Sequence, residues 1–237
     1  MIPSIYAARA VPIFTPQKLL PPDARQGYPL RHLLMSPPRA IVGGAEPDGD
    51  DEEIRFVWID LEMTGLNPDV DRILEIAVVV TGPDLRPLGE VQRVIQQPEH
   101  SMEKMSKVVQ QMHTRNRLIE ECLAATTTMR EAERAAMALV VAHCLPGEAF
   151  LCGNSVHHDW RFLARHMPRL EQYLHYRQVD VSTIKVLIQA WAPDITYDKE
   201  ISIHRALPDI HGSIAELRFY CEKVFRADLG QLIREKR

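Results

Sequence analysis

The 237-residue sequence predicts an α/β domain with a mixed sheet flanked by helices and preceded by an extended N-terminal arm. Three apolar strand patterns come first, and their short connections favour an antiparallel meander. Helical and strand patterns then alternate, as they do in a mixed sheet covered by helices. Residues 1–45 hold eight of the seventeen prolines and show no sustained periodicity, so they form an arm rather than a domain.

The arm at residues 1–45 carries five Lys or Arg residues against one Asp. Because its first 22 residues lack acids, as organelle transit peptides do, we expect a mitochondrial targeting segment. The alternative location is the cytoplasm. The alternative role of the arm is docking on a partner. Residues 46–54 form an acidic, solvated spacer, and residues 55–237 are predicted to form the globular domain.

Within the domain, alternating apolar residues and turn signals predict five strands, at residues 55–61, 73–81, 87–95, 149–153 and 179–181. Residues 101–121 show a ragged helical pattern. Thr128 and Glu131 form a capping box that opens a helix ending near residue 143. Three further helices are predicted at residues 159–166, from Ser182 as cap to 191, and at 209–225.

Composition restricts the possible partners of the chain. Residues 46–237 carry a net charge of −8 within a total of −4, which argues against a general binder of long nucleic acid. Four widely spaced cysteines without a CxxC pair indicate buried thiols in a reducing compartment. No apolar run reaches the roughly 18 residues of a membrane span, so no membrane partner is expected.

Two acids share one face of the first predicted strand, which reads FVWIDLEM from residue 56. The two-residue period of a strand puts Asp60 and Glu62 side by side, about 7 Å apart. Two half-buried carboxylates at this distance repel unless a cation lies between them, so we interpret them as metal ligands. The alternative is a strand end whose acids face solvent.

Three later residues complete a candidate site. Asp159 and Asp209 lie near predicted helix starts, where an acid is ordinarily a cap or a partner of the helix dipole. His204 precedes Asp209 by five residues and, taken alone, is more often structural than catalytic. Considered together with Asp60 and Glu62, the set is far more specific than any one member.

These residues resemble the DEDD exonuclease superfamily in its branch with a histidine base, and within it the oligoribonuclease family. The resemblance spans about residues 55–225 and rests on four segments: WIDLEMTGL at 58–66, LCGNSVHHDWRFL at 151–163, LHYRQVDVSTIK at 174–185 and HRALPDI at 204–210. It implies a ribonuclease-H-like fold, a homodimer, and removal of nucleotides from the 3′ end of very short single-stranded RNA.

The resemblance also implies a two-metal site. Asp60, Glu62, Asp159 and Asp209 would hold two Mg²⁺ or Mn²⁺ ions, for which oxygen ligands are suited, with Asp60 bridging them. His204, titrating near neutrality, would take the proton of the attacking water.

The resemblance further implies a set of substrate contacts. The 5′ phosphate of a dinucleotide would be capped by Ser155, Arg177, Ser182 and Thr183, because guanidinium and hydroxyl groups suit a terminal phosphate. Leu66 would wedge between the bases, His113 would lie near the 3′ nucleotide, and Tyr176 would enter the partner subunit's site. Plain helix capping is the alternative for Ser182 and Thr183.

Three positions depart from the family pattern, with Val108 in place of a tryptophan and His158 and Pro208 in place of acids. None is a predicted metal ligand, so they bear on affinity and substrate choice. Two other functions remain open: a relative that trims longer RNA or DNA ends, and a little-active component of a larger mitochondrial RNA–protein assembly docked through the arm.

Overall fold

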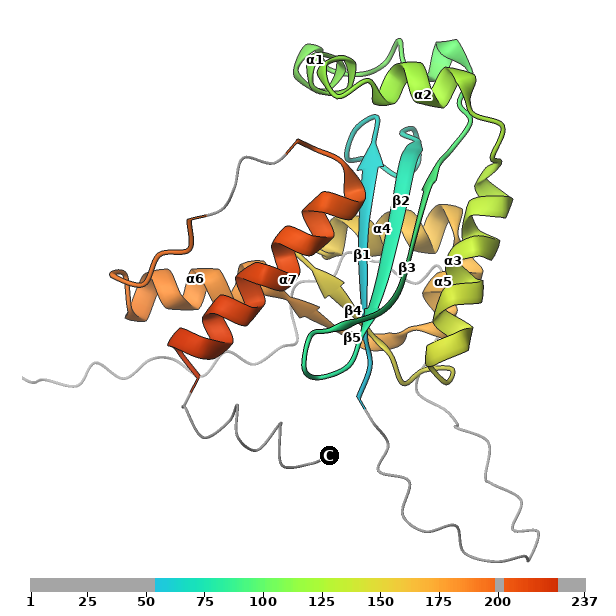
Figure 1. Ribbon diagram of the computed structural model, residues 1–237. Helices are drawn as coiled ribbons and strands as arrows, with labels where there is room; N and C mark the ends of the chain where they lie inside the picture. The colour runs from blue at the N-terminus through green and yellow to red at the C-terminus, as the bar shows by residue number, and fades with distance from the viewer. Residues whose placement is uncertain (1–53, 199–202, 226–237) are drawn as a thin grey trace, which may run out of the picture. The chain divides into compact units, whose positions relative to one another are not determined.

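The computed structural model describes residues 54–198 and 203–225. Within these ranges the chain forms a five-stranded sheet with helices on both faces (Figure 1). The expectations for the arm at residues 1–45 and for residues 46–53 of the spacer lie outside the described residues. The fold class predicted from the sequence, a mixed sheet flanked by helices, is confirmed.

The sheet has the strand order β3-β2-β1-β4-β5, which places β1 at its centre. The strands are β1 (Phe56–Met63), β2 (Ile73–Thr81), β3 (Pro87–Val94), β4 (Phe150–Gly153) and β5 (His175–Asp180). The first three form the predicted antiparallel meander, and β4 and β5 extend it with parallel pairing. The central strand is paired with β2 along its length, but with β4 only from Phe56 to Trp58.

Helices cover both faces of this sheet (Figure 1). The helices are α1 (Lys107–Arg115), α2 (Leu118–Ala124), α3 (Met129–His143), α4 (His157–His166), α5 (Pro168–Tyr173), α6 (Val181–Trp191) and α7 (Ala206–Lys223), with a 3-10 turn at Glu99–Ser101. Residues of α3, α4 and α5 share one core cluster with Val57, Ile59 and Leu61 of β1. Residues of α6 and α7 pack on the other face, against Trp58.

Because side chains alternate along β1, Asp60 and Glu62 must lie on the face of the sheet that α7 covers. Trp58 packs among residues of α7, and Asp60 and Glu62 follow it on the same side. Helices α1 and α2 lie across the end of the sheet where β1 stops (Figure 1). They pack around Leu118 and Cys122 against Leu74 of β2. The acids thus lie where a strand end, α7 and the α1–α2 pair come together.

The predicted strands are mostly confirmed, with β2 matching its predicted bounds. A fifth strand is present, but its predicted bounds of 179–181 are wrong, since β5 covers His175–Asp180 and residue 181 already belongs to α6. This strand lies at the sheet edge, and none of its side chains is buried, so the sequence shows no alternation of apolar and polar residues there. Helix α5 is not among the predicted helices, because a proline at position 168 ordinarily signals the end of a helix. It starts the helix instead, at the position where proline needs no N–H.

Two predicted helix starts are also corrected. Ser182 is not the cap of α6, because Asp180 accepts the Ser182 N–H at 2.9 Å. Helix α7 starts at Ala206 rather than at residue 209, since buried Glu75 of β2 accepts the Ala206 N–H at 2.9 Å. The capping box of Thr128 and Glu131 is present as predicted. The start of α7 has no local sequence signal, because its first N–H is bound by a residue of another element, Glu75 of β2.

The thiols agree with the predicted absence of disulfides. All four cysteines are free, and Cys122, Cys144 and Cys152 are buried. Among the described residues, no helix has both the length and the apolar character needed to cross a membrane.

Candidate active site

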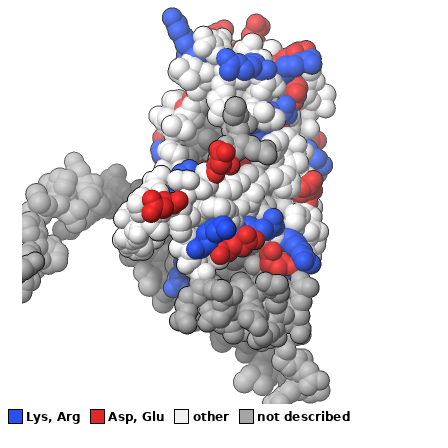
Figure 2. Space-filling model, turned by 60° about the vertical axis from the view of Figure 1, so that its left-hand side comes forward, with Lys and Arg blue, Asp and Glu red and all other residues white. Residues whose placement is uncertain are grey.

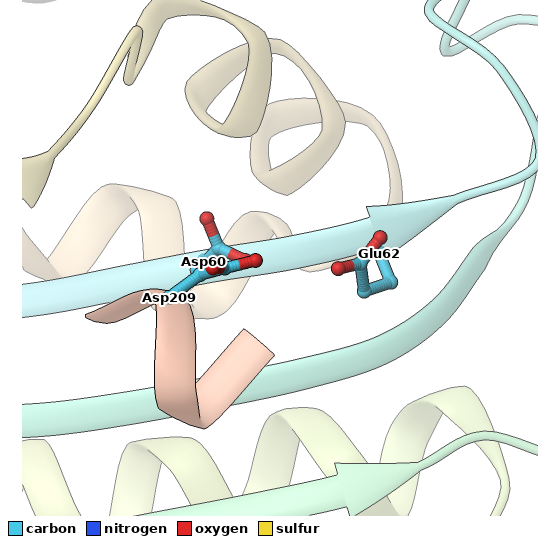
Figure 3. A group of neighbouring side chains, drawn as sticks. All are labelled: Asp60, Glu62 and Asp209. Carbon is cyan, nitrogen blue, oxygen red and sulfur yellow. The ribbon is translucent and has the colours of Figure 1, made fainter. Parts of the chain in front are cut away.

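The site begins with the end of β1. Beyond Trp58, which pairs with Cys152, β1 has no further paired residue on β4. The side chains of Asp60 and Glu62 point from the same face of the strand toward the start of α7 (Figure 3). Glu62 is buried and Asp60 is half-buried. Two acids of one strand are thus held together in a place partly closed to water.

Helix α7 supplies the third acid. Asp209 is the fourth residue of α7, and its carboxylate lies beside that of Asp60 (Figure 3). Carboxylate oxygens of Asp60, Glu62 and Asp209 all lie within 4.8 Å of one another. Residues almost 150 positions apart in the chain therefore form one group of oxygen ligands.

Asp159, the fourth predicted ligand, lies next to this trio but is not part of it at that distance limit. It is buried in α4, and its Oδ1 accepts the N–H of Leu61 at 3.0 Å. This N–H lies past the last paired residue of β4, so Asp159 replaces the missing strand partner. The bond holds Asp159 against the strand segment between Asp60 and Glu62.

The carboxylates perturb one another. Burial raises the pKa of Glu62 to about 8, with further contributions from the negative charges of Asp209, Glu75 and Asp159, while Arg205 acts in the opposite direction. Burial also raises the pKa of Asp159 to about 7, against the hydrogen bond from Leu61. The carboxylates therefore disfavour one another's charged forms. A cluster of hard oxygen ligands of this kind fits a divalent metal ion.

The two predicted histidines belong to different elements near this cluster. His113 on α1 is fully buried, with Nε2 3.1 Å from the carbonyl oxygen of Met63 and 3.8 Å from Oε2 of Glu62. Burial lowers the pKa of His113, and so does the nearby charge of His204. His204 is exposed, two residues before α7, with φ +53°. The structure thus brings both histidines to the carboxylate end of the sheet.

The predicted phosphate cap is assembled in part. The Ser155 N–H donates to Oγ of Ser182 at 3.0 Å, and their hydroxyls are 3.3 Å apart. This pair joins the β4–α4 turn to the start of α6. Thr183 is the next residue on α6 and is exposed. Arg177 lies on β5, where its guanidinium stands over the ring of Tyr176 at 5.2 Å, and no contact joins it to the serine pair.

Tyr176 and Leu66 are both exposed, at 68% and 60%. Leu66 lies in the turn after β1, which is built around Asp71. This carboxylate accepts hydrogen bonds from the Thr64 hydroxyl at 3.1 Å and from the Asn67 N–H at 2.8 Å. A Cβ at Gly65 would lie 2.5 Å from Asp71, so the turn needs glycine there. The ordered turn holds the Leu66 side chain in solvent, three residues past the end of β1.

Several polar residues around the site were not predicted from the sequence. They are Glu75, Asn116, Asn154, Asp180 and Arg205. Glu75 is fully buried on β2, opposite Glu62, and is paired with Arg205 at 2.7 Å. Asn154 connects Ser182 to Ser213 of α7. A readable signal existed for Glu75, since an acid inside the apolar run ILEIAVVV is costly unless it is paired.

The three departures from the family pattern lie outside the trio. Val108 is 75% exposed on α1. Pro208 lies in the first turn of α7, where its missing N–H breaks no helical bond. His158 is half-buried next to His157, and burial lowers its pKa. Their effect on substrate choice stays a prediction.

Comparison with known sequences shows similarity over most of the described chain. The profile of the exonuclease family RNase_T matches residues 57–217. An oligoribonuclease of Streptomyces avermitilis is 50% identical over 175 residues, which cover 72% of this chain and 87% of the relative. An oligoribonuclease of Shewanella loihica is 43% identical over 177 residues, covering 74% of this chain and 98% of the relative.

Comparison with solved structures gives the same fold at low identity. The zinc-bound E. coli exonuclease I complex with single-stranded DNA superimposes with a TM-score of 0.60 at 15% identity, covering 73% of this chain. Exonuclease I of Methylocaldum szegediense gives a TM-score of 0.56 at 15% identity over 72% of this chain. The match spans 42% and 41% of those longer chains. At this identity the likeness concerns the fold alone.

The raised pKa of Glu62 predicts how metal binding depends on pH. The folded metal-free protein keeps a proton on this carboxyl up to about pH 8, whereas the unfolded chain releases it near 4.5. The stabilising contribution is therefore present below 4.5 and lost as the pH rises through about 8. A divalent ion binds the deprotonated form, so Mn²⁺ should raise the melting temperature of EDTA-treated protein more near pH 8 than near pH 6.

Glu62→Gln tests this prediction by calorimetry. The neutral amide cannot titrate, so the metal-free variant should lose the pH dependence due to residue 62 and most of the gain from Mn²⁺. Glu103→Gln, the same change at an exposed position, should behave like the wild type. Equal Mn²⁺ shifts at both pH values, or an unchanged response in Glu62→Gln, would contradict the assignment.

Proposed function

The chain belongs to the exonuclease family and, within it, to the oligoribonucleases, and from this premise we propose that it degrades very short RNAs to mononucleotides. It is a metal-dependent 3′-to-5′ exoribonuclease. The observation that carries this function is the group of carboxylates of Asp60, Glu62 and Asp209. A scaffold without activity would have no need to hold three mutually repelling acids together, and that alternative is not favoured.

The proposed chemistry assigns one role to each group. Asp60, Glu62, Asp209 and Asp159 would hold two Mg²⁺ or Mn²⁺ ions, which supply Lewis acidity toward the scissile phosphate and lower the pKa of bound water. His204 would accept the proton of the attacking water, for which a neutral imidazole is suited. His113 would lie beside the 3′ nucleotide, since it packs against the carbonyl of Met63 at the end of β1.

The preference for short RNA is supported by the residues that surround the site. Ser155 and Ser182, with Thr183, would bind the 5′ phosphate of a dinucleotide, with Arg177 as a further cation. Leu66 would contact the bases from its exposed turn. On the face in Figure 2, most of the described surface is uncharged, and its basic side chains form separate groups rather than a continuous stripe. Long nucleic acids need many such phosphate contacts.

A homodimer is supported by the apolar residues at the β5 edge of the sheet. Tyr176 on β5 is 68% exposed, and Val186, Leu187 and Trp191 on α6 are 61%, 40% and 78% exposed. Large apolar side chains left in solvent on two consecutive elements are typical of an interaction surface. A second copy of the chain would cover them, and Tyr176 would then enter the partner's site.

The arm at residues 1–45 and its destination are a separate proposal. Its basic composition favours mitochondrial targeting, with docking on a larger RNA–protein assembly as the alternative. Residues 1–45 fused to a fluorescent reporter should send it to mitochondria. A fusion with Arg9→Glu and Lys18→Glu should stay diffuse, since import signals need positive charge. A wild-type fusion that stays in the cytosol would refute targeting.

Hydrolysis of a 5′-phosphorylated RNA dinucleotide tests the central proposal. Asp60→Asn keeps the size of the side chain but weakens metal binding, so the rate should fall about a thousandfold. His204→Ala should lower kcat about a hundredfold or more while metal binding persists. EDTA should stop the wild type, and Mg²⁺ or Mn²⁺ should restore it. A wild type no faster than Asp60→Asn would exclude the function.

A ladder of RNA lengths tests substrate choice separately. With a 5′-phosphate cap, the dinucleotide should be hydrolysed fastest, and rates should decline as the chain lengthens. Ser182→Ala should weaken this preference, because it removes a hydroxyl from the cap. Rates that rise steadily with length would reject the cap while leaving exonuclease activity intact.

The dimer is tested by sedimentation of the purified protein. Trp191→Glu places a charge in the proposed interface, so the variant should sediment as a monomer with lowered activity on the dinucleotide. Val141→Glu is the matched control, because Val141 on α3 is 53% exposed and belongs to the opposite face of the sheet. A monomeric wild type, or a Trp191→Glu dimer with full activity, would refute the interface.

A further inference from the structure

His204 has a backbone conformation that few residues adopt. Its φ of +53° lies in the left-handed region, where the Cβ of an L-residue crowds the following carbonyl oxygen. Such a conformation persists in a non-glycine residue only when surrounding contacts hold it. Two sets of hydrogen bonds act on the backbone of His204 and on Arg205, the residue that follows it. They therefore decide where the imidazole points.

The first contact comes from Asn116, directly after α1. Its Nδ2 donates to the carbonyl oxygen of His204 at 2.5 Å and lies 3.4 Å from that of Ile203. Its Oδ1 accepts the N–H of Leu118, the first residue of α2, at 3.1 Å. One side-chain amide thus joins the α1–α2 junction to the backbone of His204 across 88 sequence positions.

The second contact holds the residue that follows His204. The guanidinium of Arg205 bonds to both carboxylate oxygens of Glu75, at 2.7 to 3.2 Å, and to Glu121 of α2 at 2.8 and 3.1 Å. Glu75 also accepts the Ala206 N–H, which ties the start of α7 to β2. A forked arginine with two carboxylate partners has little freedom to rotate.

The same α1–α2 pair also contacts the metal-ligand strand. His113 on α1 packs against the carbonyl of Met63 at 3.1 Å, directly after Glu62. Glu75 lies opposite Glu62 in the register of β1 and β2. The helices that hold His204 are therefore attached to the strand that carries the carboxylates. These helices therefore fix the position of the His204 backbone relative to β1, the strand that carries Asp60 and Glu62.

We propose that Asn116 is a positioning residue that holds the backbone of His204 in its left-handed conformation, while the ion pairs of Arg205 hold the residue that follows. The inference rests on the proposed function, in which His204 is the base. Asn116 touches neither metal nor reacting atoms in this scheme. It acts through the carbonyl of His204, and loss of its donor lets the imidazole leave the reactive position.

Asn116→Asp separates the two bonds of the side chain. The carboxylate still accepts the Leu118 N–H but cannot donate to the carbonyl of His204, and it repels that oxygen. In dinucleotide hydrolysis, kcat should fall about tenfold or more, with KM changed less than about threefold, because the base acts in the transition state. The melting temperature should stay close to that of the wild type, since the α2 start keeps its acceptor.

Two further variants support this test. Gln111→Glu makes the same amide-to-acid change at an exposed position of α1 and should leave kcat unchanged. Glu121→Gln weakens only the hydrogen bonds of Arg205 to Glu121, and Glu75 still binds the guanidinium. In this variant kcat should therefore fall by less than in Asn116→Asp. An Asn116→Asp protein with wild-type kcat would overturn the inference, and so would an equal loss in Gln111→Glu.

A double-mutant cycle distinguishes positioning from general damage. If Asn116 acts through His204, then Asn116→Asp should lower kcat by less than about twofold in a His204→Ala background. A loss as large as in the wild-type background would overturn the inference. The proposed function itself fails only if the wild type is no faster than Asp60→Asn. If the wild type is active but the losses of kcat in Asn116→Asp and His204→Ala are additive, the proposed function holds and the role of Asn116 is refuted.

Discussion

The mutual repulsion of buried carboxylates at the end of β1 is the constraint around which the domain is built. Burial raises the pKa of Glu62 to about 8, so the fold holds this group in a place where its charge is costly. Asp209 and Asp159 are brought beside it from two helices on opposite faces of the sheet. Proteins tolerate such a group where a cation is bound and where the chemistry requires it.

The surrounding polar contacts offset part of this cost and give the site its shape. Arg205 pairs with buried Glu75, and its positive charge lowers the pKa of Glu62. The same Glu75 accepts the first N–H of α7, the helix that carries Asp209. Removal of one partner from such a pair would leave a buried charge uncompensated. The pair therefore links the electrostatics of the site to the placement of the helix.

The local patterns of the chain were sufficient for most of the fold. The meander β1 to β3 and the capping box at Thr128 follow from neighbouring residues, so they could be predicted. Helix α5 and the extent of β5 could not, because an edge strand exposes side chains without clear alternation and Pro168 both ends and starts helices. These errors lie where tertiary contacts override local preference.

The sequence by itself determined that Asp60 and Glu62 share a face, because the period of a strand is a local property. It also pointed to Asp159, Asp209 and His204, since their spacing matches a family. Only the tertiary structure decided that Asp209 meets the strand acids and that Asn116 reaches the backbone of His204. Such contacts depend on how α7 and the α1–α2 pair pack on the sheet. No pattern of neighbouring residues records that packing.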